Sequence, residues 1–434
     1  MTTDGPAFVA LPGSDAETRQ RIPLSGSSFQ LHASARAITM NLITSGLGSA
    51  IFSLPWSMAG CSLIPSLLII AAVLLVNAWT ISIIVRAADR YGDYDLGSLL
   101  TRLPGRLGKF LGPFTDVLVF VTMFVCLVSY IIAIYDSAHR FLEGAHTPRW
   151  VVVALASLLV LPLCFLDQRR LERTSGLAIF INIYLFVLLG YLFTKRALDY
   201  DSNPLPEGSC VLGSTVRGSF AISSIMFQAV AIQMCVLPMY QELEHRTPEK
   251  MDQIVAVGFG VLFLIFCGFG IAGYFYIGPQ VQSNILKDLP RGPWADLAQV
   301  GTIMVAACVY PIMLYPMIAT LTSFSGTDAE EPNTLFGRIS PRGWCPGSEA
   351  CIAKIIIVAL AAVMANSVTS LGFVNTFNGA LTAGVFVAVL PSVVGYFLLD
   401  HSRLYKVLLL ALLVFGLALA GCGLVLTDNY LDDL

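Results

Sequence analysis

The chain has 434 residues, of which 56% are hydrophobic and only 12% are charged, and its formal net charge at pH 7 is -3. Soluble domains carry about 25% charged residues, so this chain has too few charges to cover a water-facing globule. The composition therefore predicts an integral membrane protein. No basic block or motif typical of nucleic-acid binding occurs in it, so we expect no nucleic-acid partner.

A polar stretch opens the chain. Residues 1–35 lack the apolar core of a signal peptide, so we expect a disordered, uncleaved cytoplasmic tail. Eleven apolar runs follow, each long enough to cross a bilayer as a helix. The expected spans are 37–60, 63–86, 113–138, 150–166, 174–194, 218–239, 253–277, 297–322, 351–367, 372–399 and 404–427. We therefore predict an all-α polytopic membrane protein with one transmembrane domain, 36–427, and a short extracytoplasmic C-terminus, 428–434.

Lys and Arg are distributed unevenly between the two sides of the predicted bundle. With the N-terminus in the cytoplasm, most of the 25 Lys and Arg residues fall in cytoplasmic segments, as the positive-inside rule requires. An odd number of spans then places the acidic C-terminal end outside the cell or in a lumen. A plasma membrane and a vacuolar or lysosomal-type membrane both fit, and no particular oligomeric state is predicted.

The first span is interrupted by Gly46, Gly48 and Pro55. Irregular backbone at membrane depth survives where it lines a cavity or binds a ligand. An unwound stretch here presents the amides of Gly48, Ser49 and Ala50 at the start of the following half-helix, where the helix dipole favours an anion such as a carboxylate. Small residues at this spacing also permit close helix packing, and the sequence leaves both interpretations open.

The sixth span carries Gln228 and Gln233 at mid-depth, followed by Pro238. Buried glutamines need hydrogen-bond partners, and they serve either a polar cavity or bonds between helices. Interruptions at matching places in two halves of five spans predict an inverted-repeat transporter.

Charged side chains are missing from the span interiors. A permanently cationic ligand needs a buried acid, whereas helix-end amides and carbonyls at a break suit a zwitterion. No nucleotide-binding loop and no hydrolase or metalloprotease motif occurs, so we expect a transporter that is neither an enzyme nor driven by ATP, and that needs no cofactor.

Five segments in order carry a resemblance to a known family. They are the first broken span, 41–56, and the segments 129–136, 236–247, 310–316 and 371–380, the last followed by Leu390-Pro391-Ser392. In these segments the chain resembles the amino acid/auxin permease family, nearest its sodium-coupled neutral amino acid transporter branch. The resemblance implies eleven helices, a five-plus-five inverted repeat with helices one and six broken, and alternating access around a midplane site.

The resemblance also implies which residues bind the substrate. The amides around Gly48 and Ser49 are expected to hold its carboxylate, while the pocket for its side chain draws on further positions along helices three, six and ten. The complete expected substrate-binding set is Thr44, Gly46, Gly48, Ser49, Ala50, Ser129, Phe227, Gln228 and Asn375.

Ion coupling is where the chain departs from the sodium-coupled branch. That branch has Asn at the position of Thr44 and a hydroxyl on the eighth helix, where this chain reads Ala306-Ala307-Cys308-Val309. Na⁺ prefers oxygen ligands, which Ala and Cys side chains lack. We therefore expect H⁺ rather than Na⁺ as the coupling ion, with Asp136 as the candidate relay and Thr44 as the other ion-coupling candidate.

The sequence thus predicts a secondary active transporter of small neutral amino acids. The alternative is an amino-acid-sensing transceptor that signals through its cytoplasmic tail and loops. A channel or receptor that uses its helices only as a scaffold predicts continuous helices one and six instead.

Overall fold

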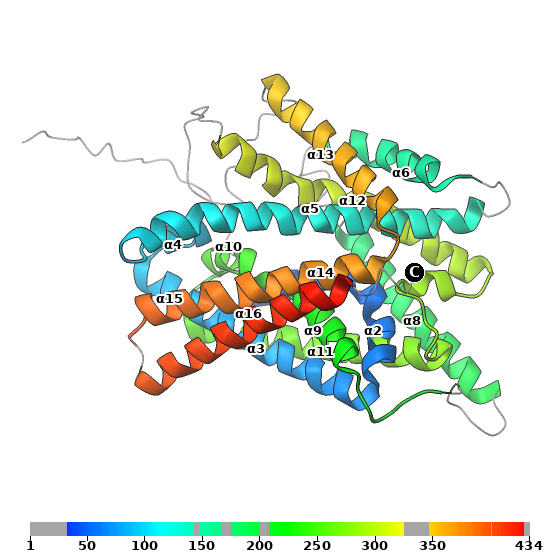
Figure 1. The fold of residues 1–434 in the computed structure, drawn as a ribbon, viewed down its shortest axis with the longest axis horizontal. Coiled ribbons are helices and arrows are strands. Elements are labelled where there is room, and N and C mark those ends of the chain that lie inside the picture. The colour runs from blue at the N-terminus through cyan, green and yellow to red at the C-terminus, as the bar shows by residue number, and fades with distance from the viewer. Residues whose placement is uncertain are drawn as a thin grey trace, which may run out of the picture.

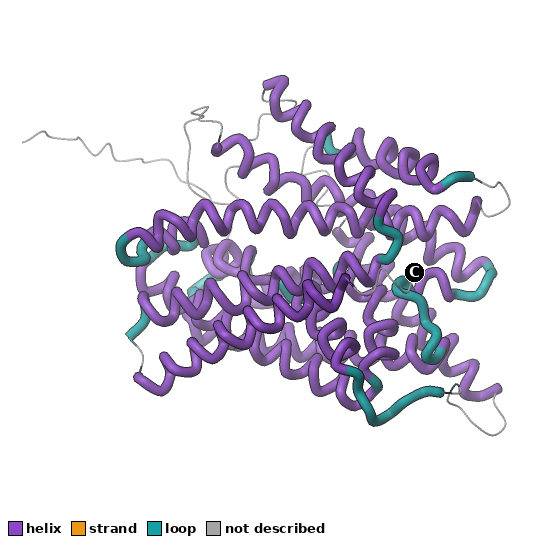
Figure 2. The backbone as a smooth tube through the Cα atoms, in the orientation of Figure 1, coloured by secondary structure: helices purple, strands orange, loops and turns teal. Residues whose placement is uncertain are grey.

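The computed structural model describes residues 33–142, 147–165, 175–199, 206, 208–324, 347–400 and 402–428. Nearly all of the predicted tail, 1–35, and of the predicted C-terminal segment, 428–434, lies outside these residues. Helices make up almost the whole described backbone (Figure 2), which confirms the all-α class. Within the described part, pairing of the β type is limited to an isolated bridge between Ala33 and Leu243.

The elements follow the apolar runs of the sequence. In chain order they are α1 (Ala35–Gly46), η1 (Ser49–Ser53), α2 (Leu54–Cys61), α3 (Leu63–Tyr91), α4 (Leu96–Thr101), α5 (Arg106–Leu142), α6 (Arg149–Leu163), α8 (Ser175–Asp199), α9 (Val216–Ala229), η3 (Ile232–Met234), α10 (Val236–Glu242), α11 (Pro248–Ile277), η4 (Ile285–Asp288), α12 (Pro293–Phe324), α13 (Gly347–Ser367), α14 (Leu371–Thr382), the π-helical η5 (Ala383–Val389), α15 (Leu390–Leu398) and α16 (Arg403–Asp428).

The long helix α5 runs across the width of the molecule in Figure 1. It packs against α12 and α13 on one side and against α14 on the other. Helix α9 lies on the same side of α5 as α14, in contact with α2, α3, α14 and α16. The two interrupted spans are therefore enclosed by other helices, so their irregular backbone is screened from lipid as membrane proteins require.

Both predicted interruptions are confirmed. Within the described residues, seven helices are long and apolar enough to cross a membrane, and two bent pairs raise this to nine. One pair joins α1 to η1 and α2 at 46°, and the other joins α9 and η3 to α10 at 42°. These bends exclude the simplest form of a channel or receptor that uses its helices only as a scaffold, because that form requires continuous helices one and six. Two shorter apolar helices, Arg149–Leu163 and Cys351–Ser367, occupy the expected fourth and ninth spans, so the count of eleven is not confirmed.

Glycines bring the α9 backbone into direct contact with its neighbours. A Cβ atom on Gly379 of α14 would overlap the backbone carbonyl of Ser224 on α9, and one on Gly218 of α9 would overlap the carbonyl of Gly60. Glycine is thus required at these positions for close approach rather than for a special backbone angle. The contacts hold the second broken span between α2 and α14.

We expect Gly379→Ala to destabilise the fold by about 1–3 kcal/mol or more, because overpacking against backbone cannot be relieved by a rotamer change. A lower melting temperature in detergent measures the effect. Gly260→Ala on α11 is the matched control, because nothing lies within 4 Å of a Cβ built there. That control should be neutral or slightly stabilising, and equal melting temperatures for the two variants would contradict the close contact.

Candidate functional site

The first break leaves three backbone amides available. Helix α1 ends at Gly46, and η1 starts at Ser49 with no side chain capping its N-terminus. Among the described residues, no backbone hydrogen bond engages the amides of Gly48, Ser49 or Ala50. Buried N–H groups normally have a partner, so this stretch is suited to hold a hydrogen-bond acceptor. The helical segment that follows, Ser49–Cys61, adds the positive end of its dipole.

Helix α5 supplies the polar wall opposite this break. The Oγ atoms of Ser49 and Ser129 lie 3.3 Å apart, and Ser129 Oγ donates to the Cys126 carbonyl at 2.8 Å. Ser49 is 5% exposed and Ser129 is fully buried. A Cβ atom on Gly48 would lie 3.8 Å from the Tyr130 hydroxyl, which places Tyr130 beside the break. The hydroxyls of Ser129 and Tyr130 on α5 therefore lie beside the first break.

A second polar group joins the two broken spans through α14. Gln228 Nε2 donates to Asn375 Oδ1 at 3.1 Å, and Asn375 Nδ2 donates to Ser53 Oγ at 3.0 Å. Gln228 Oε1 is buried and has no hydrogen-bond partner among the described residues. A buried acceptor without a partner fits a ligand that brings a donor. Ser53 was not predicted, although its position four residues after Ser49 in an interrupted span was the available signal.

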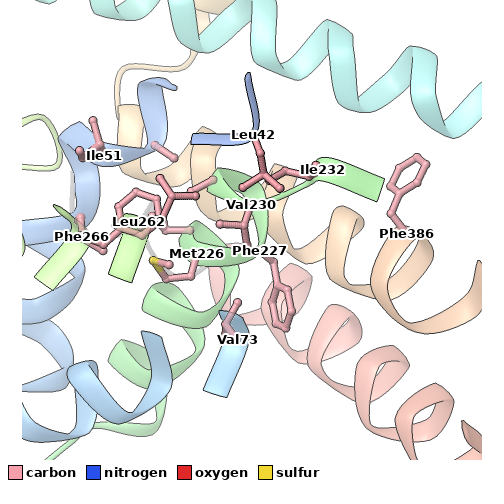
Figure 3. Close-up of a cluster of buried hydrophobic side chains, with 14 of the residues drawn as sticks. Leu42, Ile51, Val73, Met226, Phe227, Val230, Ile232, Leu262, Phe266 and Phe386 are labelled. Atoms are coloured by element: carbon pink, nitrogen blue, oxygen red, sulfur yellow. The ribbon is translucent and has the colours of Figure 1, made fainter. Parts of the chain in front are cut away.

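The remaining predicted residues lie away from these polar groups. Phe227 is 5% exposed and belongs to the buried apolar cluster drawn in Figure 3, with Val73 of α3 and Ile51 of η1. Thr44 donates its hydroxyl to the Met40 carbonyl within α1. Gly46 is buried, and a Cβ atom there would come within 2.7 Å of Leu262 on α11.

Two of the expected residues thus make packing contacts, while Ala50, 2% exposed, contributes to the break through its amide. The structure thus brings Ser49 and Ser129 together beside the Gly48 backbone, and it joins Gln228 and Asn375 to Ser53, four residues after Ser49 on η1. Phe227, Gly46 and the Thr44 hydroxyl make other contacts.

Asp136 lies two helical turns past Ser129, about 10 Å further along α5. Its side chain is fully buried, with Oδ1 2.9 Å from Lys287 Nζ and Oδ2 accepting from Asn284 Nδ2 at 2.9 Å. Both partners belong to the segment between α11 and α12 that contains η4. Arg140, one turn later, donates to the Leu289 and Pro290 carbonyls of the same segment, each at 2.7 Å. Asp136 is therefore a buried, ion-paired group rather than a solvated helix end.

A recess opens near the far end of α2. It is lined by Trp56, Ser57, Ala59, Gly60, Gly218, Ala221, Pro279 and Val281. None of Ser49, Ser129, Gln228 and Asn375 lines it, so the polar groups at the breaks are not part of this surface hollow.

Comparison with known proteins places the whole helical region in one class. The family model for Transmembrane amino acid transporter protein matches residues 32–427. Amino acid transporter AVT6E of Arabidopsis thaliana is 21% identical over 380 residues, which cover 82% of this chain and 75% of that protein. Putative sodium-coupled neutral amino acid transporter 11 of Mus musculus is 23% identical over 410 residues, which cover 92% and 86%.

Among solved structures, the inward-facing conformation of Mhp1 matches with a TM-score of 0.58 at 14% identity, covering 92% of this chain and 91% of that one. At this identity the likeness bears on the fold alone. It confirms the predicted five-plus-five inverted-repeat architecture with two broken helices.

Proposed function

The chain belongs to the family of transmembrane amino acid transporter proteins, and on that premise we propose that it moves small neutral amino acids across a membrane by alternating access. The observation that supports this most strongly is that each of the two breaks carries buried polar atoms without a partner among the described residues. The free amides beside Gly48 offer donors, and Gln228 Oε1 offers an acceptor. Donors at one break and an acceptor at the other suit a zwitterion, whose carboxylate accepts hydrogen bonds and whose ammonium donates them.

The roles follow from which atoms are free. The substrate carboxylate accepts from the amides of Gly48, Ser49 and Ala50, with the hydroxyl of Ser129 nearby. The substrate ammonium or a side-chain donor pairs with Gln228 Oε1, whose amide is held in place by Asn375. None of the residues in this group is charged, so a net charge on the substrate side chain has no counterpart here.

The coupling ion in this proposal is the proton. Ala306 and Ala307 are buried on α12 and offer no side-chain oxygen, and the Thr44 hydroxyl is already bonded to a carbonyl of its own helix. Sodium coordination therefore has few free side-chain oxygens in these two places. Asp136, buried and paired with Lys287, is the titratable group that we assign to proton coupling. The protein is a multi-pass membrane protein, and we place its N-terminus in the cytoplasm, in a plasma or vacuolar-type membrane.

Uptake into proteoliposomes tests the function directly. Labelled neutral, cationic and acidic amino acids are presented under sodium and proton gradients that are imposed separately. We expect an inward proton gradient to drive accumulation of small neutral amino acids, and a protonophore to abolish it. Absence of uptake and of exchange across the whole panel would reject transport, and accumulation driven by sodium alone would reject proton coupling.

A further inference from the structure

The two glutamines of the second broken span face different helices. Gln228 bonds to Asn375 of α14, whereas Gln233 in η3 turns to α3, where its Nε2 donates to Asn77 Oδ1 at 2.7 Å and to Thr80 Oγ1 at 3.2 Å. Gln233 is 1% exposed, and Asn77 and Thr80 are fully buried. The candidate site accounts for Gln228 but not for Gln233.

The direction of the Gln233 amide is set by α3 itself. Asn77 Nδ2 donates to the Val73 carbonyl at 2.8 Å, and Thr80 Oγ1 donates to the Asn77 carbonyl at 3.0 Å. Both side chains have thus used these donors on their own helix and present acceptor oxygens to η3. Only a residue with a donor at position 233 satisfies both acceptors, and leaving them unpaired in a buried site is costly.

The contact of Gln233 with α3 lies just before the start of α10, and a second contact with α3 lies near the end of α10. Tyr240, fully buried, donates its hydroxyl to Asp89 Oδ1 of α3 at 2.7 Å. Helix α10 has only seven residues, so its own hydrogen bonds do little to fix its position. It is attached to α3 on both sides, through Gln233 before it and through Tyr240 within it.

We propose that Gln233 is a positioning residue for transport, whose amide, with Asn77 and Thr80, fastens the unwound linker of the second broken span to α3. Helix α10 then keeps its place on α3 while α9 and the polar groups at the breaks change their arrangement. This inference rests on the proposed transport function. Among the described residues no hydrogen bond joins Gln233 to Gln228 or Asn375, so we expect its loss to slow the turnover of the transporter and to leave substrate affinity unchanged.

Gln233→Glu provides a readout that a purely structural role would not move. An ionised carboxylate only accepts, so it cannot satisfy Asn77 Oδ1 and Thr80 Oγ1, whereas a protonated acid donates one hydrogen bond. Burial favours the neutral form of a carboxyl, so acidification is expected to restore part of the contact with α3. The charged and titratable groups on the elements around η3 are Arg36 on α1, Arg86, Asp89, Arg90 and Tyr91 on α3, Cys235 beside η3, and Tyr240 and Glu242 on α10.

The experiment is amino acid exchange in proteoliposomes with the same pH on both sides, from about pH 8 to about pH 5. We expect the exchange rate of Gln233→Glu relative to wild type to be reduced about tenfold or more at the alkaline end and to recover several-fold on acidification. Its half-saturating substrate concentration should stay within about twofold of wild type. Gln228→Glu, the same substitution at the candidate site, should instead raise that concentration.

A second measurement does not depend on transport. Hydrogen–deuterium exchange in detergent should be faster at residues 231–242 in Gln233→Leu than in wild type, with α3 unchanged above Asn77. A flat rate ratio across the pH range together with unchanged hydrogen exchange would overturn the role of Gln233. If wild type exchanges no amino acid, the proposed function fails instead, and the hydrogen-exchange arm still decides whether Gln233 fastens the linker.

Discussion

Amino acid uptake by Gly48→Val should fall about 10- to 100-fold while the amount of folded protein in the membrane stays unchanged. The backbone at Gly48 is extended, with φ -94° and ψ -166°, which any residue adopts. A Cβ atom there meets only the Tyr130 hydroxyl, at an ordinary 3.8 Å. A branched side chain therefore costs the fold little and fills the space in front of the free amides. Losing one to two charge-assisted hydrogen bonds corresponds to this range.

Binding and folding are separated by measuring both. Substrate-induced stabilisation in detergent reports binding, and the melting temperature without substrate reports the fold. Gly46→Val is the matched control two residues away, where a Cβ atom would press on Leu262. That variant should have a lower melting temperature in the absence of substrate. Normal uptake by Gly48→Val would remove the break at Gly48 from the substrate site.

The breaks themselves could be predicted from sequence because their causes are local. Glycine and proline weaken a helix wherever they stand, and Gly48 and Pro55 lie at the N-cap of η1 and in the first turn of α2. The apolar runs fixed the helical class in the same way, because a backbone in lipid must satisfy its own hydrogen bonds. The family resemblance then proposed the topology, and the family match confirms that resemblance.

Side-chain direction was harder to predict. Phe227 and Gln228 were both expected to line the pocket, yet adjacent residues on a helix point about 100° apart. In the structure Gln228 faces α14 and Phe227 packs into the apolar core. The glycine at 46 carries the same ambiguity: small residues serve unwinding and close packing equally well in sequence, and only the position of Leu262 decides between them.

Hydrogen-bond and ion-pair partners that are distant in sequence could not be predicted from the local pattern. Nothing in the local pattern indicates that Gln233 bonds to Asn77, 156 residues earlier. The same holds for Asp136, the candidate relay, whose partners could not be predicted from its place near the end of an apolar run. The segment between α11 and α12 folds back over that end and buries its carboxylate against Asn284 and Lys287.

That burial leads to the second large effect, the loss of proton-driven accumulation in Asp136→Asn. Protonation of Asp136 would end its attraction to Lys287, 2.9 Å away, and so weaken the attachment to α5 of a segment that Asn284 and Arg140 also hold. Asparagine is neutral and nearly isosteric, so it holds the protein permanently in the protonated arrangement. We expect Asp136→Asn to exchange amino acids across the membrane yet to accumulate none under an inward proton gradient. Accumulation at the wild-type level would exclude Asp136 as the relay.

Lys287→Met tests the same pair from the other side. It leaves a buried carboxylate with Asn284 but without its cation, and should cost about 3 kcal/mol of stability, the low end for a broken buried pair, because 31% of the Lys287 side chain remains in solvent. Combining it with Asp136→Asn should recover part of that loss, since neither charge is then left alone.

Asp296→Asn is the matched control: it removes the half-exposed partner of Arg140 in the same region and should cost at most about 1 kcal/mol while coupling persists. Equal losses in Lys287→Met and Asp296→Asn would mean that the Asp136 pair is no more than a surface contact, and coupling would have to reside elsewhere in the chain.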